Sequence, residues 1–589
     1  MSASIQTDSQ ENMTSARLER RLRRIAWLAV IVLGFIQGWT NRHFINPDGV
    51  SYLDVADKYL QRDWTWAVNA YWSPLYSWLL GAALFLLRPS SYWEYPVVHL
   101  VNFLVYLGAF ACFEFLLFQV IRYQAESVKG SSSDESILPT WAWQAVGYAL
   151  FLWCALVLIT ITDVTPDMCV AALVFLSAAI LVRIRHRPNK WASFVLLGLV
   201  LGFSYLAKAV MFPVSLGFLF VCLLSVGDLR KALPRVLVSL IVFLIVGGPF
   251  IWALHKSKGR WTFGDNGGFA YAWHVNGTEA YIHWRGEPPG SGIPVRPTRK
   301  VFDSPAVYEF RDPIPATYSP WYDPSYWCEG TVAHFDLKRQ IKVLGESVMS
   351  FYAVFINSPI GMAMLVGFLV LQLSRDPRFW TWIAQIKQWN ILMPAVAALG
   401  LYSLVHIETR YIGAFVVLIW LGLFTGIFLS KDSKSARVGS SVVVAVVALI
   451  MTVIVAKSIA PAYSTVSGII RPKDSAFSEY WRVADGLARM GVEPGDQVGS
   501  ISYGFAAGSF WARLAKVRII AEITSGSNLT PKEDVNEFWH SDDEVKLSVI
   551  EAFAKTGAKV IVANRVPAGV SDPGWQRIGN TNHYVYFLR

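Results

Sequence analysis

About eleven apolar runs of membrane-spanning length divide this chain, and they constrain its fold more than any other feature. They lie near residues 25–40, 96–121, 140–161, 168–182, 191–207, 209–227, 236–254, 351–373, 390–406, 411–430 and 438–458. A run of roughly 20 apolar residues crosses a bilayer as an α-helix, because a helix satisfies its backbone hydrogen bonds internally. Only 16% of the residues are charged, whereas soluble domains are about one quarter charged. The sequence therefore predicts a polytopic α-helical membrane protein.

Lys and Arg are unevenly distributed among the connections between these runs. If the N-terminal tail (residues 1–24) is cytoplasmic, the cytoplasmic connections are 122–139, 183–190, 228–235, 374–389 and 431–437. They carry Arg122, Lys129, Arg183, Arg185, Arg187, Lys190, Arg230, Lys231, Arg235, Arg375, Arg378, Lys387, Lys431, Lys434 and Arg437. The opposite short turns carry chiefly Lys208 and Arg410. Since cytoplasmic loops are enriched in positive residues, we expect a multi-pass protein of the bacterial inner membrane with its C-terminus outside. This distribution also explains the net charge of +10 without nucleic acid as a partner.

Two segments near the N-terminus need separate interpretation. Residues 1–24 are polar and lack a small-residue cleavage site, so the run after them is expected to be a retained first span. The run from Pro74 to Leu87 is short and follows Trp64, Trp66 and Trp72. Trp is enriched at the membrane surface, so we expect an interfacial helix there rather than a crossing.

The composition after Lys457 becomes that of a soluble domain. We therefore divide the chain into the tail 1–24, a membrane module 25–460 with outer loops 41–95 and 255–350, and an extracytoplasmic domain 461–589. In that last part β-rich runs at 497–501, 517–523, 559–563 and 584–588 alternate with helical patterns at 478–490 and 545–556. This alternation predicts a small α/β domain. None of its strands is followed by a nucleotide-binding glycine pattern.

An acid stands in the first outer loop, in the segment Asn46-Pro47-Asp48-Gly49. Carboxylates beside the hydrocarbon are costly and often mark a functional site, so Asp48 is the first candidate for catalysis. The alternative is local, because Pro and Gly at this spacing favour a type I turn in which Asp has only a structural role.

Three charged residues at other span boundaries on the same side are further candidates. Asp163 and Asp167 border the turn before the run at 168–182, and Lys208 lies between two adjacent runs. Asp167 is equally compatible with a helix-capping role, and Lys208 with a side chain that extends to the membrane surface. The functional alternatives are a sugar hydroxyl or a metal for Asp163, and a lipid phosphate for Lys208.

Glu408, Arg410 and Tyr411 form the last candidate group, in the turn before the run at 411–430. Glu408 and Arg410 could form an ordinary interfacial ion pair. Residues two apart on a helix do not face each other, so we expect them to reach separate partners instead. The planar donor group of Arg410 is suited to a phosphate, whereas Tyr411 also fits the aromatic belt of a membrane protein.

Taken together, these motifs resemble the GT-C class of membrane glycosyltransferases, most closely the branch of protein O-mannosyltransferases and the lipid A aminoarabinose transferase. The resemblance covers roughly residues 20–460 and rests on Asn46-Pro47-Asp48-Gly49-Val50-Ser51-Tyr52, Thr165-Pro166-Asp167, Leu206-Ala207-Lys208 and Glu408-Thr409-Arg410-Tyr411. It implies that Asp48 is the general base. Many members have two adjacent acids there, whereas here Gly49 follows and the next acid is Asp54. Asp54 is therefore either the family residue or a structural residue that faces the membrane-side helix. Tyr52 belongs to the same motif and is taken with Asp54 as substrate-binding.

The resemblance further implies transfer of a sugar, with inversion, from a polyprenyl-phosphate donor to an acceptor hydroxyl on a lipid, glycan or protein. A divalent metal ion is left open, since some members of the class need one. Trp261, Trp273, Trp284, Trp321 and Trp327 of the long outer loop could stack on the sugar or anchor the loop to the bilayer. The alternatives are an O-antigen ligase or polymerase type of transferase, a secondary transporter and a noncatalytic envelope scaffold.

Overall fold

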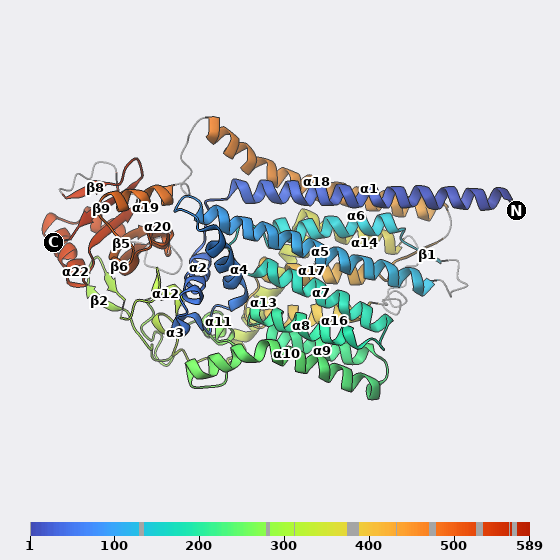
Figure 1. Cartoon of the computed structure of the whole chain (residues 1–589), viewed down its shortest axis with the longest axis horizontal. Helices are drawn as coiled ribbons and strands as arrows, with labels where there is room; N and C mark the ends of the chain where they lie inside the picture. The colour runs from blue at the N-terminus through green and yellow to red at the C-terminus, as the bar shows by residue number, and fades with distance from the viewer. Residues whose placement is uncertain are drawn as a thin grey trace.

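The computed structural model describes residues 2–128, 135–278, 283–310, 312–373, 388–430, 433–470, 479–525, 534–564, 566–567 and 574–588. The predicted cytoplasmic charges Lys129, Arg375, Arg378, Lys387 and Lys431 lie outside these residues. Within them, a helical bundle has the N-terminus at one end and a sheet domain with the C-terminus at the other (Figure 1).

Every predicted apolar run coincides with a helix. These helices are α1 (Ser2–Thr40), α5 (Glu94–Val128), α6 (Thr140–Trp153) with the π-helix η1 (Cys154–Leu158), α7 (Asp167–His186), α8 (Trp191–Ala207), α9 (Met211–Ser225), α10 (Leu229–Lys258), α14 (Pro359–Leu373), α16 (Trp389–Ser403), α17 (Thr409–Phe424) and α18 (Ser433–Ile470). Among the described residues, six helical segments are long and apolar enough to cross a membrane, or seven if the pair Leu337–Asn357 and Pro359–Leu373, bent by 71°, is one span. The helices α8, α9, α16 and α17 are shorter and also apolar. The chain is a polytopic α-helical membrane protein.

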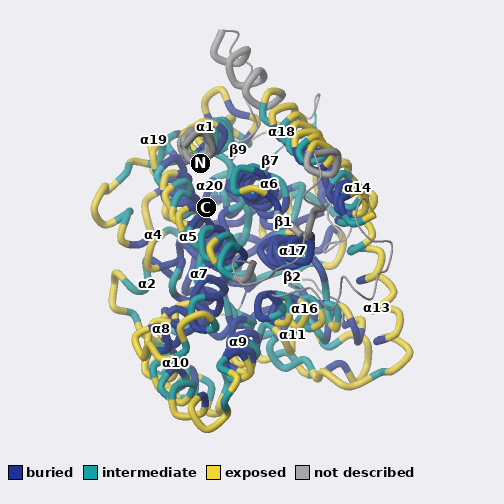
Figure 2. The backbone as a smooth tube through the Cα atoms, turned by 90° about the vertical axis from the view of Figure 1, so that its right-hand side faces the viewer, coloured by how far each residue is buried: buried dark blue, intermediate teal, exposed yellow. Residues whose placement is uncertain are grey.

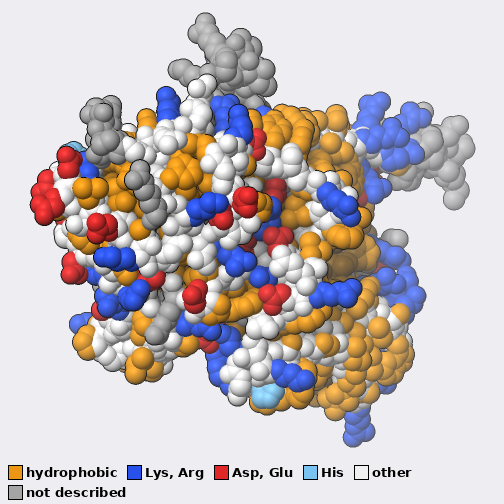
Figure 3. Space-filling model, turned by 60° about the vertical axis from the view of Figure 1, so that its left-hand side comes forward, with side chains coloured by type: hydrophobic (Ala, Val, Ile, Leu, Met, Phe, Trp, Pro, Cys, Tyr) orange, Lys and Arg blue, Asp and Glu red, His pale blue; other side chains and the backbone are white. Residues whose placement is uncertain are grey.

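The bundle buries its central helices and exposes apolar side chains around its rim. Seen along the bundle, α6, α7 and α17 are mostly buried, whereas α8, α10 and α18 carry exposed faces (Figure 2). Hydrophobic side chains cover much of the visible helical surface, and charged side chains are mixed over the sheet domain (Figure 3). Gly198 allows α8 to approach α10 closely, because a Cβ there would lie 2.2 Å from the carbonyl oxygen of Ser239. Such small residues are typical of helix contacts in membranes.

Several helices lie at the end of the bundle next to the sheet domain. They are α2 (Pro47–Leu60), α3 (Trp64–Ala67), α4 (Pro74–Leu87), α11 (Asn266–His274), α12 (Ser319–Tyr322) and the 3₁₀-helix η2 (Pro324–Tyr326) (Figure 1). The helix α13 (Leu337–Tyr352) with the π-helix η3 (Ala353–Asn357) leads into α14. The segment Asn46-Pro47-Asp48-Gly49 is not a turn. It begins α2, with Asn46 as the N-cap and Pro at the first helical position. Pro is favoured there, where its missing N–H costs nothing, so the turn prediction was wrong.

The sheet domain joins two segments far apart in sequence. Its strands have the order β2 (Arg299–Phe302), β3 (Val307–Glu309), β6 (Arg518–Ser525), β5 (Gln497–Tyr503), β7 (Val560–Asn564), β9 (His583–Phe587) and β8 (Trp575–Arg577). The strands β5, β6 and β7 pair in parallel, and the other pairs are antiparallel. The helices of this domain are α19 (Glu479–Arg489), α20 (Ala507–Ala515), α21 (Asp534–His540) and α22 (Asp543–Lys555). The strands and helices expected after residue 478 are present, and β2 and β3 come from the long loop 255–350. A separate antiparallel pair joins β1 (Glu135–Ile137) to β4 (Phe428–Ser430).

Candidate active site

A cavity of about 430 Å³ lies where the bundle meets the long loop. It is lined from α2, the start of α7, the α8–α9 turn, the long loop and the start of α17. The predicted residues that border it are Asp48, Tyr52, Asp167, Lys208, Glu408, Arg410 and Tyr411. Seven of the nine predicted site residues therefore meet in one cavity, although they come from four segments of the sequence.

Asp48 lies in the first turn of α2, where the positive end of the helix favours a negative charge. Its Oδ2 is 3.3 Å from Nη1 of Arg410. Its Oδ1 accepts a hydrogen bond of 3.1 Å from Nε1 of Trp321 in α12. Gly49 permits this placement, because a Cβ there would lie 2.7 Å from Cβ of Val164. Both oxygens of the carboxylate thus have a donor at the cavity wall.

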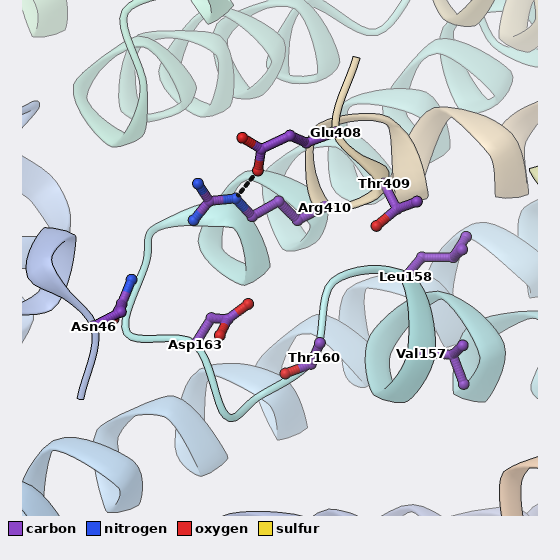
Figure 4. Close-up of a pocket in the computed structure, with 8 residues that line it drawn as sticks. All are labelled: Asn46, Val157, Leu158, Thr160, Asp163, Glu408, Thr409 and Arg410. Atoms are coloured by element: carbon purple, nitrogen blue, oxygen red, sulfur yellow. Dashed lines mark hydrogen bonds and ion pairs between the residues drawn. The ribbon is translucent and has the colours of Figure 1, made fainter. Parts of the chain in front are cut away.

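Arg410 forms ion pairs with three carboxylates of the site, those of Asp48, Asp167 and Glu408. Its Nε donates to Oε2 of Glu408 at 2.6 Å (Figure 4), and its Nη1 lies against Asp48. The expectation that Glu408 and Arg410 do not pair was wrong. Glu408 is the N-cap of α17 and has extended backbone, with φ −111° and ψ 145°, so the spacing rule for two residues inside a helix does not apply to it.

Lys208 is the second cation that lines the cavity, after Arg410. Its Nζ is 2.5 Å from Oδ1 of Asp167 and lies 3.6 Å from the centre of the Tyr411 ring. Burial lowers the pKa of Lys208 below the usual range of an ammonium, and the charge of Asp167 opposes this shift. Asp167 lies in the first turn of α7, whose N-cap is Pro166, and its Oδ2 is 3.9 Å from Nε of Arg410. Lys208 therefore faces inward instead of extending to the membrane surface.

The aromatic residues of the long loop separate into different environments. Trp273 and Trp321 line the cavity, and each packs against the buried Trp327 with ring centres 4.5 Å apart. Trp284 is fully buried, whereas Trp261 is exposed and stacks on His255. Tyr52 packs edge-on against Trp72 and Tyr76. The sequence did not single out His274, whose ring stacks on His406 at 4.0 Å where both line the cavity.

Asp163 lies in a neighbouring cavity of about 400 Å³, whose walls also include Asn46, Thr160, Glu408 and Arg410 (Figure 4). Burial raises the pKa of Asp163, and the charge of Arg410 opposes part of this shift. Asp48 and Asp163 thus border different cavities, with Arg410 lining both. In the described part of the chain, no three His, Cys, Asp or Glu side chains are placed to hold a metal ion together.

Asp54 lies outside both cavities. It is buried, and its Oδ1 is 2.9 Å from Nη1 of Arg513 in α20. It also accepts hydrogen bonds from the backbone and hydroxyl of Thr317 at 3.0 and 2.9 Å. The sequence could not show this pairing, although an Arg within the apolar segment Trp511-Ala512-Arg513-Leu514 is a sign of a buried partner.

The fold of the helical membrane part with its C-terminal sheet domain is similar to that of a solved GT-C glycosyltransferase. The crystal structure of ArnT from Cupriavidus metallidurans bound to undecaprenyl phosphate matches with a TM-score of 0.51 and 12% identity, covering 95% of this chain and 97% of that chain. The archaeal oligosaccharyltransferase AglB from Archaeoglobus fulgidus, in complex with an inhibitory peptide and a dolichol-phosphate, matches with a TM-score of 0.44 and 13% identity, covering 93% and 69%. No family model and no curated protein matches the sequence. The predicted fold class is confirmed.

Proposed function

We propose that this protein is a membrane glycosyltransferase. It transfers a sugar, with inversion, from a polyprenyl-phosphate donor to the hydroxyl of a lipid, glycan or protein acceptor on the outer face of a bacterial inner membrane. One observation carries this proposal: a single cavity brings the carboxylate of Asp48 together with the cations Lys208 and Arg410. The fold supports it, because the similar ArnT structure was solved with undecaprenyl phosphate.

Lys208 and Arg410 are proposed to hold the donor phosphate. Each contacts a carboxylate at the cavity wall, Asp167 at 2.5 Å and Asp48 at 3.3 Å. A phosphate offers several oxygens to a guanidinium and an ammonium, and such charge-assisted bonds are among the strongest in proteins. Binding of the phosphate would draw Arg410 away from Asp48 and free that carboxylate.

Asp48 is proposed as the general base. The acceptor oxygen attacks the anomeric carbon, its proton passes to Asp48, and the bond from that carbon to the phosphate oxygen breaks. The polyprenyl phosphate leaves with the electron pair, and its growing charge is stabilised by Lys208 and Arg410. Attack opposite the leaving group inverts the anomeric centre. A positioned base typically contributes about 10²–10⁴-fold.

The remaining predicted residues are assigned supporting roles in substrate binding. Asp167 and Glu408 hold the two cations in place, and Tyr411 covers the ammonium of Lys208. Tyr52 forms part of the cavity wall, while Asp163 faces the adjacent cavity, where it is available to a sugar or acceptor hydroxyl. Trp273 and Trp321, which line the cavity, are proposed to stack on the sugar.

The replacement Asp48→Asn tests the base assignment, because it keeps the size of the side chain and removes its basicity. We expect kcat to fall about 10²–10⁴-fold, measured as transfer of a labelled sugar from a polyprenyl-phosphate donor by protein reconstituted in lipid. The control is Asp303→Asn, since Asp303 is an exposed acid of the long loop. A correctly inserted Asp48→Asn protein with the unmodified rate would show that Asp48 is not the base.

A further inference from the structure

A buried ion cluster joins the sheet domain to the membrane part. Arg513 of α20 is 2% exposed and contacts three acids. Its Nη1 lies 2.9 Å from Oδ1 of Asp54 and 2.5 Å from Oδ2 of Asp57, and its Nε donates to Oε1 of Glu94 at 2.7 Å. Burying a charged guanidinium is costly, and the three surrounding carboxylates offset this cost.

Two of these acids belong to the helix that carries the proposed base. Asp54 and Asp57 lie on α2, whose first turn holds Asp48. Asp48 and Asp54 are six residues apart, which is about 9 Å along a helix and about one and two-thirds turns. They therefore face different sides of α2, one toward the cavity and the other toward the sheet domain. Arg513 pairs with Asp54 and Asp57 on the face of α2 that is turned toward the sheet domain. Two contacts on one face fix the rotation of α2 about its axis, and this rotation determines where Asp48 points.

A second set of contacts connects the ion cluster to Asp48 through the long loop. Asp54 also holds Thr317 by two hydrogen bonds, and Trp321, four residues later, donates to Asp48 at 3.1 Å. The hydroxyl of Ser51 in α2 donates to the carbonyl of Trp321 at 3.3 Å, and Phe505 of the sheet domain packs edge-on against the Trp321 ring. The partner that orients the Asp48 carboxylate is thus tied to the same cluster.

We propose that Arg513 is a positioning residue for Asp48 and that the C-terminal sheet domain serves the active site by fixing α2 and the α12 loop. This inference rests on the proposed function. A buried ionic cluster is often no more stabilising than apolar residues of the same size. The ion pairs of this cluster are directional, whereas apolar packing is not, so the cluster holds α2 in a single rotation about its axis. A misplacement of about 1 Å at a reacting group can cost about 10²-fold in rate.

The chain offers a matched control on the same helix. Lys516 also binds Glu94, at 2.7 Å, but it is 45% exposed. Its ion pair is with Glu94 of α5, whereas Arg513 also pairs with Asp54 and Asp57 of α2. The variants are therefore Arg513→Lys, which cannot reproduce the fork that spans Asp54, Asp57 and Glu94, and Lys516→Ala.

The test measures kcat and KM for a polyprenyl-phosphate sugar in the full-length protein. Arg513→Lys is expected to lower kcat about ten- to a hundredfold with the donor KM unchanged within about twofold, whereas Lys516→Ala changes neither. In an Asp48→Asn background, Arg513→Lys should cause no further loss, because residues that act through one group are not additive. A further loss of similar size in that background would overturn the proposal. If Arg513→Lys does not fold, Asp57→Asn replaces it, since Asp57 is 31% exposed, with an expected loss of several-fold.

Hydrogen exchange of residues 47–60 separates this inference from the proposed function. Arg513→Lys is expected to speed exchange in α2, and Lys516→Ala is not. If the unmodified protein transfers no sugar, the proposed function fails, and the exchange result alone decides whether Arg513 holds α2. Unchanged exchange in the Arg513→Lys protein would overturn the positioning role whatever the activity.

Discussion

Two clusters of three acids and two bases lie on either side of α2, and they differ in access to the cavity. The first contains Asp48, Asp167, Glu408, Lys208 and Arg410, and the second contains Asp54, Asp57, Glu94, Arg513 and Lys516. Arg410 is 19% exposed and borders a cavity, whereas Arg513 is 2% exposed and is enclosed by its partners. Two clusters of similar composition can therefore have different roles. A cation beside a cavity can exchange a carboxylate for a substrate phosphate, and an enclosed cation can only hold its neighbours.

The largest contrast is expected in stability when each arginine loses its charge. Arg513→Met leaves buried acids without their partner, which typically costs about 3–5 kcal/mol. In Arg410→Met the carboxylates that lose Arg410 still border the cavity, and Asp167 keeps its ion pair with Lys208. We therefore expect the free energy of unfolding to change by at most about 1 kcal/mol. Thermal unfolding of both full-length variants measures this difference. Equal destabilisation would remove the distinction between the two clusters.

A second contrast is expected in donor binding. Arg410→Met should weaken the affinity for a polyprenyl phosphate by about 1.5–3 kcal/mol, the usual contribution of hydrogen bonds to a charged group. Arg513→Lys should leave that affinity unchanged, because Arg513 does not line the cavity. Binding of a fluorescent polyprenyl phosphate to protein in lipid nanodiscs gives both values. An unchanged affinity in Arg410→Met would make Arg410 a structural residue like Arg513.

The smallest effect concerns Asp163 and the pH dependence of stability. Burial raises its pKa above the ordinary value of 3.8. A carboxyl with a higher pKa in the folded state adds stability below pH 3.8, and this stability is lost as the pH rises through the folded pKa. The ionised form therefore opposes folding at neutral pH. Asp163→Asn should raise the melting temperature by about 1–2 °C at pH 7, with the gain shrinking toward pH 4. A gain that persists at pH 4 would point to another cause.

The membrane helices and most strands of the tail could be predicted, because apolarity and alternation are local properties of the sequence. The pairing of β3 with β6 could not, since it joins Tyr308 to Glu522 across more than 200 residues. A three-residue strand has no recognisable pattern of its own. The long loop and the tail were therefore treated as separate, and their common sheet appears only in three dimensions.

The sequence predicted which residues meet in the cavity in outline, because charged residues at the ends of spans on one side of a bundle lie close together. Its details depended on where each helix begins. Pro47 fits the first position of a helix as well as a turn, and the N-cap position of Glu408 decides that it pairs with Arg410. Asp54 was placed with the substrate residues because the sequence does not show which side of α2 faces the sheet domain. Arg513, its partner, lies more than 450 residues away.

The central claim is that the cavity beside Asp48 receives a lipid phosphate, and a structure of the full-length protein with a polyprenyl phosphate tests it most directly. We predict the phosphorus between Lys208 and Arg410, with oxygens about 2.7–2.9 Å from their nitrogens, and Asp48 separated from Arg410 and facing the sugar position. A phosphate bound elsewhere, with Arg410 still against Asp48, would contradict the account.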